Sequence, residues 1–225
     1  MKRGVSAAYV PLLALLVGAG CAHPLGIERP VLTRTVARSA AELNNAAAAF
    51  GGLAIRLRQS VIISYQGRDL LLSGLLVLDP ASGSARLVAS QDLGPTVLAL
   101  TVSATGYELL RPPPAPYDHP LLVAGVAAGV RRLFLAPPGS GAATFRQESR
   151  VYRGQFGEGA AARHCLLGGE PLVLLEATGQ AENGPWRVTY GNYRQCPSGF
   201  LPMALVYEEA ANRLRVTVWN ESVEP

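Results

Sequence analysis

The residues best suited to chemistry in this sequence are its three cysteines, Cys21, Cys165 and Cys196. A cysteine can act as a nucleophile, ligate a metal, form a disulfide or carry an acyl chain. Cys21 differs from the other two because it follows a long apolar run and three small residues, in the stretch LLVGAGCAHP. The surroundings of each cysteine therefore decide which chemistry applies to it.

The first twenty residues have the layout of a secretory signal. Lys2 and Arg3 form a positive start, residues 7–17 are almost entirely apolar, and residues 18–20 are small. The apolar stretch is shorter than the roughly 20 residues that a membrane-spanning helix needs. We therefore expect residues 1–20 to be a signal peptide that is removed. The alternative is a plain export signal cleaved near Ala19, with Cys21 an incidental thiol.

The box that ends at Cys21 resembles the signal of bacterial lipoproteins, in which a run of small residues precedes an acylated cysteine. The resemblance implies that Cys21 is the lipid attachment point and carries two or three chains. One chain alone holds a protein only reversibly, at about 0.8 kcal/mol per buried methylene, so several chains give a stable anchor. Ala22 stands where an aspartate often marks retention at the inner membrane. The resemblance therefore implies the periplasmic face of the outer membrane.

The other two cysteines have no such signal around them. An exported compartment permits disulfides, and an even pair suggests one. We expect a bridge between Cys165 and Cys196, which would stabilise the chain by roughly 3–4 kcal/mol. The alternative is a pair of free thiols. A metal site is not expected, because His23, His119 and His164 lack the spacing of metal ligands.

The remaining reactive residues do not combine into a catalytic site. Ser140 lies in PPGSGAAT rather than in a nucleophile elbow, and the neighbouring pair Asp118 and His119 cannot form a dyad alone. Asp118 is expected to cap the helix that follows it. Trp186 and the tyrosines near it suit either sheet packing or the mouth of a ligand site. We predict that the chain is not an enzyme and needs no cofactor.

Composition points to one globular domain. Apolar residues make up 49% of the 225 residues and charged residues 16%, with a formal net charge of +4. That apolar content is ample for a core. The arginines are scattered rather than clustered with aromatic residues, so nucleic acid is not an expected partner.

The pattern of apolar residues predicts a mainly β chain with two helices. Residues 35–49 and 121–135 are expected to be helical, and the stretches around them alternate in hydrophobicity as strands do. Turn signals every ten residues or so predict an antiparallel meander. We divide the chain into a signal peptide (1–20), a lipidated tether (21–34) and one domain (35–225).

Two of the predicted strands carry apolar residues on both faces. Leu70 to Leu78 and Leu172 to Leu175 do not alternate, as a strand with one wet face would. We therefore expect both faces of these strands to be covered, one by the helices. A curved sheet wrapped round the helices, or round a ligand, would cover the other.

Two long stretches resemble the lipoprotein-localisation family, which includes a periplasmic lipoprotein carrier and its outer-membrane receptor. The first is ISYQGRDLLLSGLLVLDPASGSARLVASQDLGPTVLALTVSATGYELL and the second is CPSGFLPMALVYEEAANRLRVTVWN. The resemblance implies an α+β fold in which an open antiparallel half-barrel is closed by helices. It also implies an apolar hollow that takes acyl chains. The hairpin tip DPASGSA lacks the leucine of the receptor, so we expect a relative with another lipid cargo.

These observations predict a monomeric envelope lipoprotein that binds or transfers the acyl chains of a membrane lipid or a lipoprotein. The alternative is a structural or assembly lipoprotein that docks an envelope protein and binds no ligand. The candidate cavity residues are apolar or aromatic positions on the predicted strands and the second helix: Leu57, Leu72, Leu76, Leu98, Leu100, Val126, Leu174 and Tyr190.

Overall fold

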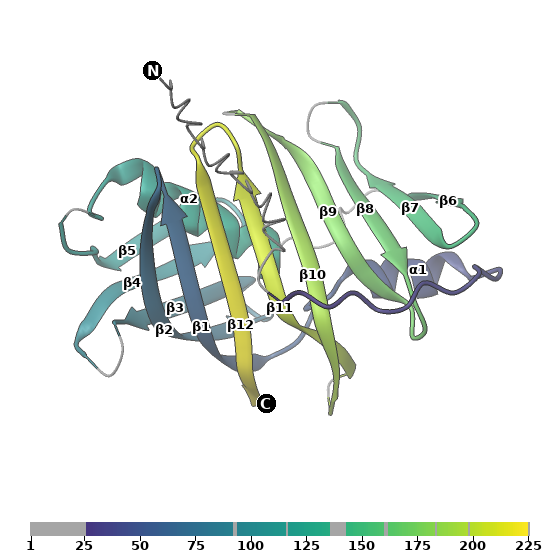
Figure 1. Ribbon diagram of the computed structural model, residues 1–225, viewed down its shortest axis with the longest axis horizontal. Coiled ribbons are helices and arrows are strands. Elements are labelled where there is room, and N and C mark those ends of the chain that lie inside the picture. Colours follow the sequence, from purple (N-terminus) through teal and green to yellow (C-terminus); the bar gives the residue numbers. More distant parts are fainter. Residues whose placement is uncertain are drawn as a thin grey trace, which may run out of the picture.

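The computed structural model describes residues 26–91, 94–115, 117–135, 143–159, 162–182, 184–197 and 199–224 (Figure 1). Its main feature is one twelve-stranded sheet. The strands are β1 (Ile55–Tyr65), β2 (Arg68–Asp79), β3 (Ser84–Ser90), β4 (Thr96–Ser103), β5 (Tyr107–Arg111), β6 (Thr144–Gln147), β7 (Val151–Phe156), β8 (Arg163–Gly168), β9 (Val173–Ala181), β10 (Gly184–Cys196), β11 (Gly199–Glu209) and β12 (Leu214–Glu224).

The sheet is an antiparallel meander with one long-range junction. Its order is β5-β4-β3-β2-β1-β12-β11-β10-β9-β8-β7-β6, so the first and last strands pair in the middle, with Val61 opposite Val218. We call β1–β5 the first half of the sheet and β6–β12 the second half. The edge strands β5 and β6 do not pair with each other, so the sheet stays open. The predicted open antiparallel half-barrel is confirmed.

The hairpin between β1 and β2 shows how the local sequence sets the register. Gln66 and Gly67 form a two-residue turn with positive φ values of 51° and 81°. A turn of this hand matches the twist of the two strands. It fixes Ile63 opposite Leu70 and Val61 opposite Leu72, so that their side chains face the same side of the sheet.

The first helix, α1 (Ala40–Ala47), is shorter than the predicted helix over residues 35–49. Ser39 and Glu42 form a capping box, in which the Ser39 hydroxyl accepts from the Glu42 N–H and the Glu42 carboxylate accepts from the Ser39 N–H. This cap satisfies two otherwise unpaired N–H groups and sets the start of the helix. Leu43 and Ala47 are the buried residues of α1, which contacts β8 and β9.

The second predicted helix consists of two segments, α2 (Pro120–Val130) and η1 (Arg131–Leu135), and η1 is a π-helix. Its N-cap is His119 rather than the expected Asp118, because the His119 Nδ1 accepts a hydrogen bond from the Leu121 N–H at 3.2 Å. Pro120 occupies the first helical position, where its missing N–H costs nothing. Most of α2 is buried against the concave face of the sheet (Figure 1).

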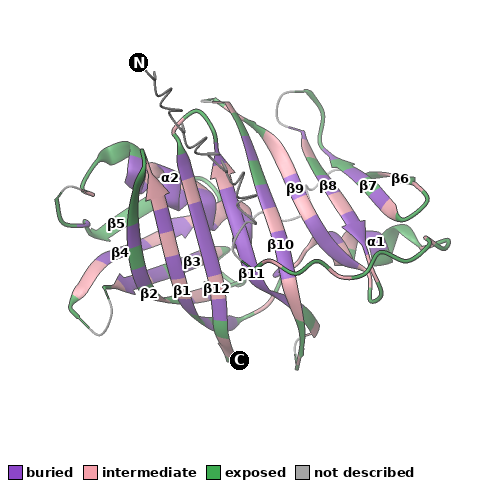
Figure 2. Ribbon diagram, viewed as in Figure 1, coloured by how far each residue is buried: buried purple, intermediate pink, exposed green. Residues whose placement is uncertain are grey.

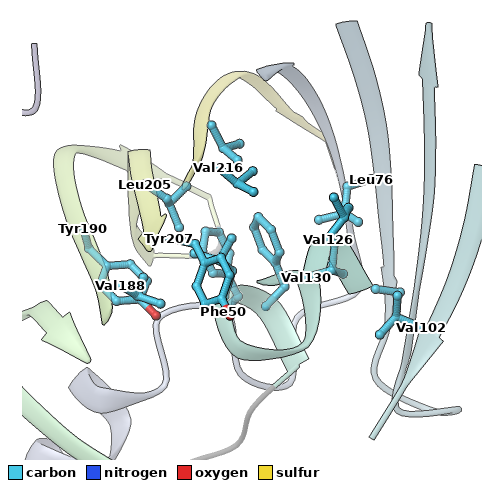
Figure 3. Packing of buried hydrophobic residues seen from close by; sticks show 14 of the residues in the cluster. Phe50, Leu76, Val102, Val126, Val130, Val188, Tyr190, Leu205, Tyr207 and Val216 are labelled. Atoms are coloured by element: carbon cyan, nitrogen blue, oxygen red, sulfur yellow. The ribbon is translucent and has the colours of Figure 1, made fainter. Parts of the chain in front are cut away.

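A single hydrophobic core fills the concave side of the sheet. It joins apolar side chains of both halves to α1, α2 and η1. In Figure 3, Val126 of α2 lies against Leu76 of β2, while Tyr207 and Phe50 lie near Val130. Phe50 also packs on Phe134 of η1, with their ring centroids 4.9 Å apart.

Residues 27–36, which we call the strap, cross the convex face of the second half before α1 begins (Figure 1). The Asn192 N–H donates to the Glu28 carbonyl at 2.8 Å, and the Glu28 N–H donates to the Asn192 side chain at 2.6 Å. Farther along, the Thr35 N–H donates to the Ser149 carbonyl at 3.1 Å. Most of the expected tether is thus fastened to the domain. Cys21 and the predicted signal peptide lie outside the described residues.

The two strands that were predicted to be covered on both faces differ in their surroundings. Leu174 and Leu175 of β9 are both buried, as expected. In β2 the prediction of two covered faces is wrong, because Leu71 and Leu75 remain 59% and 41% exposed while Leu70 and Leu76 are buried. Figure 2 shows exposed and buried residues along β2, whereas β11 is buried along most of its length.

Candidate functional site

All the predicted cavity residues lie in the hydrophobic core. Each is buried and belongs to the same cluster. Val126 comes from α2, five others come from the concave side of the first half, and two come from the second half. The first-half residues are Leu57 on β1, Leu72 and Leu76 on β2, and Leu98 and Leu100 on β4; the second-half residues are Leu174 on β9 and Tyr190 on β10.

The hollow that these residues were expected to line is filled by α2 and η1. A cavity of about 20 Å³ remains between the helices and β1–β4 and β12, and its walls include Leu72, Leu98 and Val126. A cavity of this size holds about one water molecule, whereas a benzene molecule needs about 150 Å³. An acyl chain therefore cannot enter unless α2 and η1 move.

Two glycines bring α2 close to the sheet. A Cβ on Gly125 would collide with the Leu214 side chain, and a Cβ on Gly129 would lie 3.2 Å from Cδ1 of Tyr207. Larger residues at these positions would push α2 outward. The contact is apolar on both sides, so it depends on shape and buried area rather than on hydrogen bonds.

Arg131, at the junction of α2 and η1, ties the helices to the β4–β5 hairpin. Its Nε donates to the Ser103 carbonyl at 2.8 Å and its Nη2 donates to the Gly106 carbonyl at 3.0 Å. Burial, together with the neighbouring Arg132, lowers the pKa of the Arg131 guanidinium. The guanidinium stays charged, since even a lowered arginine pKa lies far above neutrality.

Arg132 makes the second polar tie, to the second half of the sheet. It donates to the Tyr207 hydroxyl, and that hydroxyl donates to the buried Glu209 carboxylate at 3.1 Å. The Arg132 guanidinium also lies 5.1 Å from the centroid of the Trp186 ring. Burial raises the pKa of Tyr207, and Arg132 partly offsets the rise. The Tyr207 hydroxyl thus links the buried Glu209 carboxylate to the positive Arg132 guanidinium through two hydrogen bonds.

An open groove of about 790 Å³ adjoins this network at one end of the second half. Its lining combines Trp186 with charged side chains such as Glu209, Arg213 and Arg215. Of the aromatic residues that the sequence suggested for a ligand mouth, Trp186 lines this groove. Tyr190 is buried in the core instead, and the Tyr193 hydroxyl donates to the Leu174 carbonyl. Sequence alone did not single out Arg132, Tyr207 or Glu209.

The predicted disulfide is absent, since Cys165 and Cys196 are free thiols. Cys165 pairs with Ala177, which pairs with Val188 on β10, while Cys196 lies at the far end of that strand. At about 3.3 Å per residue, the eight residues from Val188 to Cys196 separate the thiols by about 26 Å. A disulfide requires Cα atoms within about 7 Å, so a bridge would need the sheet to rearrange.

The other reactive residues lie apart. His119 caps α2 and His164 lies on β8 at the groove. Within the described ranges, no group of three histidine, cysteine or acidic residues is placed to hold a metal ion. His23 and Ser140 lie outside those ranges.

The chain is similar to solved structures that include the following three. The first is a DUF1329 family protein from Desulfovibrio piger, with a TM-score of 0.50 and 10% identity, covering 82% of this chain and 89% of that one. The chain shares its fold with this protein. No protein-family model and no curated protein matches the sequence.

Two further neighbours carry names of the lipoprotein-localisation family that the sequence resembles. One is an outer membrane lipoprotein-sorting protein domain from Vibrio parahaemolyticus (TM-score 0.49, 9% identity, 82% of this chain and 90% of that one). The other is a LolA superfamily protein from Nitrosomonas europaea (TM-score 0.48, 9% identity, 84% of this chain and 94% of that one). Among the described residues, no helix has the length and hydropathy to cross a bilayer.

Proposed function

We propose that the chain is a lipoprotein anchored at the periplasmic face of the outer membrane through acylated Cys21. Its half-barrel would bind the acyl chains of a lipid or of another lipoprotein. The observation that carries this proposal is the aliphatic concave face of the first half, which α2 and η1 cover. When α2 and η1 move aside, a hydrocarbon chain can replace their contacts with the sheet.

We call α2 and η1 together the cover. The cover suits such an exchange because few hydrogen bonds hold it to the sheet. The hydrogen bonds that hold α2 and η1 to the sheet come from Arg131 and Arg132 at their junction, while the rest of the contact is apolar. An entering acyl chain would restore the buried apolar area that the helix gives up, at about 25 cal/mol per Å². The apparent affinity for the chain then depends on the fraction of molecules with the cover displaced.

A photoactivatable palmitic acid tests this proposal on the full chain in its membrane. The sites of crosslinking are mapped by mass spectrometry, and we expect labels on concave-facing residues such as Val126 and Leu72. Removing the Arg131 hydrogen bonds with Arg131→Ala costs the closed state about 2 kcal/mol, which raises the open fraction and the labelling about 30-fold.

The matched control is Arg153→Ala, which removes an exposed arginine on β7 that pairs with Glu148 and lies far from the cover. Its labelling should equal that of the wild type. Circular dichroism and cooperative unfolding confirm that each variant is folded. Folded wild-type and Arg131→Ala chains that take no label on the concave face would contradict the carrier function.

The cavity of about 20 Å³ supports a second candidate function. In this alternative the chain is a structural or assembly lipoprotein that docks an envelope protein, and the core is permanently filled by its own side chains. Crosslinking in the envelope would then recover a partner in equal amount, and the interior would stay unlabelled even in Arg131→Ala.

A further inference from the structure

The convex face of the first half carries two apolar pairs, one on each side of Ser73, that nothing in the described chain covers. Leu71 lies opposite Ile62, and Leu75 lies opposite Val88, so these four side chains share one face of β1–β3. Leu71 and Leu75 are 59% and 41% exposed, and the other two are partly buried. In a monomer, exposed apolar residues gathered in this way mark a surface that contacts something else.

Exposed arginines border this surface. Arg58 lies opposite Leu75, while Arg56 and Arg86 both lie opposite Val77, the next convex residue of β2. We call Leu71, Leu75, Ile62 and Val88 together with Arg56, Arg58 and Arg86 the convex patch. Four acids lie around it: Glu224 opposite Arg56, Glu221 next to the same end of β12, Asp69 two residues before Leu71 on β2, and Glu108 two strands from Arg86.

The arginines of the convex patch differ from those of the second half. Arg187 pairs with Glu176 at 3.6 Å, and Arg215 pairs with Glu208 at 4.0 Å. Within the described residues, none of the three convex-patch arginines is in an ion pair. Their charges are available to an outside anion, and their aliphatic stems extend the apolar area.

The strap starts on the same convex face of the sheet as the convex patch, which keeps Cys21 within reach of that side. The strap begins over Gly191 of β10, where a Cβ would lie 2.6 Å from the Glu28 carbonyl oxygen. Gly191 lies four strands from β2, a span of about 19 Å at roughly 4.8 Å per strand. The five residues from Cys21 to Gly26 reach at most about 18 Å. Acyl chains on Cys21 would thus enter a bilayer on the convex side of the sheet.

We infer that the convex patch docks the domain on the bilayer, with its leucines in the interface and its arginines on anionic lipid headgroups. The orientation rests on the proposed acylation of Cys21, but not on the proposed acyl-chain binding. Leucine and arginine together suit this interface, because the apolar side chains enter the headgroup region while each arginine gains energy near an anionic surface. The concave face with α2 then points away from the membrane.

The two tryptophans of the chain provide a native test. Trp219 lies opposite Ser60 on the convex face, whereas Trp186 lies on the concave side beside Arg132. The processed full chain is reconstituted into vesicles of phosphatidylethanolamine and phosphatidylglycerol that contain brominated lipids, which quench nearby tryptophans. We expect strong quenching in the wild type and its loss in Trp219→Phe, which retains only Trp186.

Two double variants test the composition of the patch. Arg58→Gln with Arg86→Gln should lower the ratio of docked to undocked molecules about 30-fold on anionic vesicles. Each arginine near an anionic surface raises this ratio about fivefold, and the two factors multiply. Leu71→Ser with Leu75→Ser should lower it about 10- to 30-fold on any vesicle. The matched controls, Leu121→Ser on α2, which the docked orientation turns away from the membrane, and Arg153→Gln on β7, should leave quenching unchanged.

The outcomes separate the two proposals. A chain that mass spectrometry shows to be acylated at Cys21, but in which Trp219 is not quenched, would overturn the docking inference alone. A chain without acyl groups would overturn the anchoring itself. Equal quenching on vesicles of phosphatidylcholine alone, unaffected by the arginine variants, would overturn the role of anionic headgroups.

Discussion

The apolar stretches of β2 and β9 look alike in sequence but have different surroundings. Leu174 and Leu175 of β9 are covered on both sides of the sheet, whereas in β2 only the concave residues are covered and Leu71 and Leu75 face outward. The difference comes from the strap. Leu32 lies 2.9 Å from where a Cβ on Gly168 would be, next to Leu175, so the strap closes the convex face of the second half alone.

The halves also differ on their concave sides. Among the buried side chains, those on the concave face of the first half are aliphatic apart from Gln59, whereas those of the second half include titratable groups such as Cys165, Tyr190 and Tyr207. An aliphatic surface is suited to exchange one apolar contact for another. Buried hydroxyls and thiols instead fix a structure, because each must keep its partner or stay neutral. The comparison suggests a stable second half and an adaptable first half.

The largest expected effect is on the core of the first half. Leu76 is fully buried, so Leu76→Ala should lower the free energy of unfolding by about 3 kcal/mol. Urea unfolding measures the loss. If the first half is adaptable, hydrogen exchange in β1–β4 should rise more than in β8–β11. A uniform rise across the sheet would contradict the division into two halves.

Alkaline pH should lower the free energy of unfolding through buried groups in the second half. Burial raises the pKa of the Cys165 thiol from 9.0 to about 11, so the folded state keeps the proton that the unfolded chain loses. Stability is thus fully present below about pH 9 and falls by about 2–3 kcal/mol as the pH rises to about 11. Tyr190 and Tyr193, whose pKa values are also raised by burial, add a loss of the same sign.

Urea midpoints across this pH range measure the effect. Cys165→Ala should retain only the part of the loss that comes from the tyrosines. Cys196→Ala serves as the control and should behave as the wild type does. Alkylation at neutral pH gives an independent check, since the buried Cys165 should react only after unfolding.

A smaller effect is expected where the strap crosses β10. A Cβ at Gly191 would lie 2.6 Å from the Glu28 carbonyl oxygen and would also collide with Ile27, so Gly191→Ala should displace the strap and cost about 1–3 kcal/mol. Limited proteolysis should then cut within residues 27–34, which should stay protected in the wild type. Gly67→Asn in the β1–β2 turn, where asparagine tolerates positive φ, provides a glycine control.

The smallest expected effect lies on the uncovered face. Leu71→Ala should change the free energy of unfolding by less than about 0.5 kcal/mol, because the side chain is mostly exposed. Leu72→Ala, at the next residue on the same strand, should cost about 2–3 kcal/mol because Leu72 is buried. A costly Leu71→Ala would mean that the convex face of β2 is covered after all.

The sequence predicted most of the local structure. The antiparallel meander, the two helical segments and the burial of every candidate cavity residue follow from hydrophobic period and turn residues, which are local properties, whereas the open half-barrel came from the family resemblance. The evenly apolar composition of α2 favours a buried helix, but it does not say how completely the helix would fill the hollow. Whether Val126 lines a cavity or plugs it depends on how close Gly125 and Gly129 bring the helix to the sheet, and that is a tertiary property.

The two main errors have the same origin. Cys165 and Cys196 are a plausible pair by count and compartment, but the strand register, which is not visible in a count, holds them far apart. Likewise, uncovered Leu71 and covered Leu175 have equivalent local patterns, and only the path of the strap distinguishes them. The network of Arg132, Tyr207 and Glu209 also joins residues distant in sequence.

The route of the strap has a mechanical consequence. Any pull on the N-terminal side of Gly26 passes first to Asn192 on β10, then to Ser149 and to Tyr152 on β7, which accepts from the Val36 N–H at 3.1 Å. From there it reaches α1, and none of these attachments involves α2 or η1. A force applied at the N-terminal end of the strap would therefore act on the second half of the sheet. It would not act directly on α2 and η1, which cover the first half.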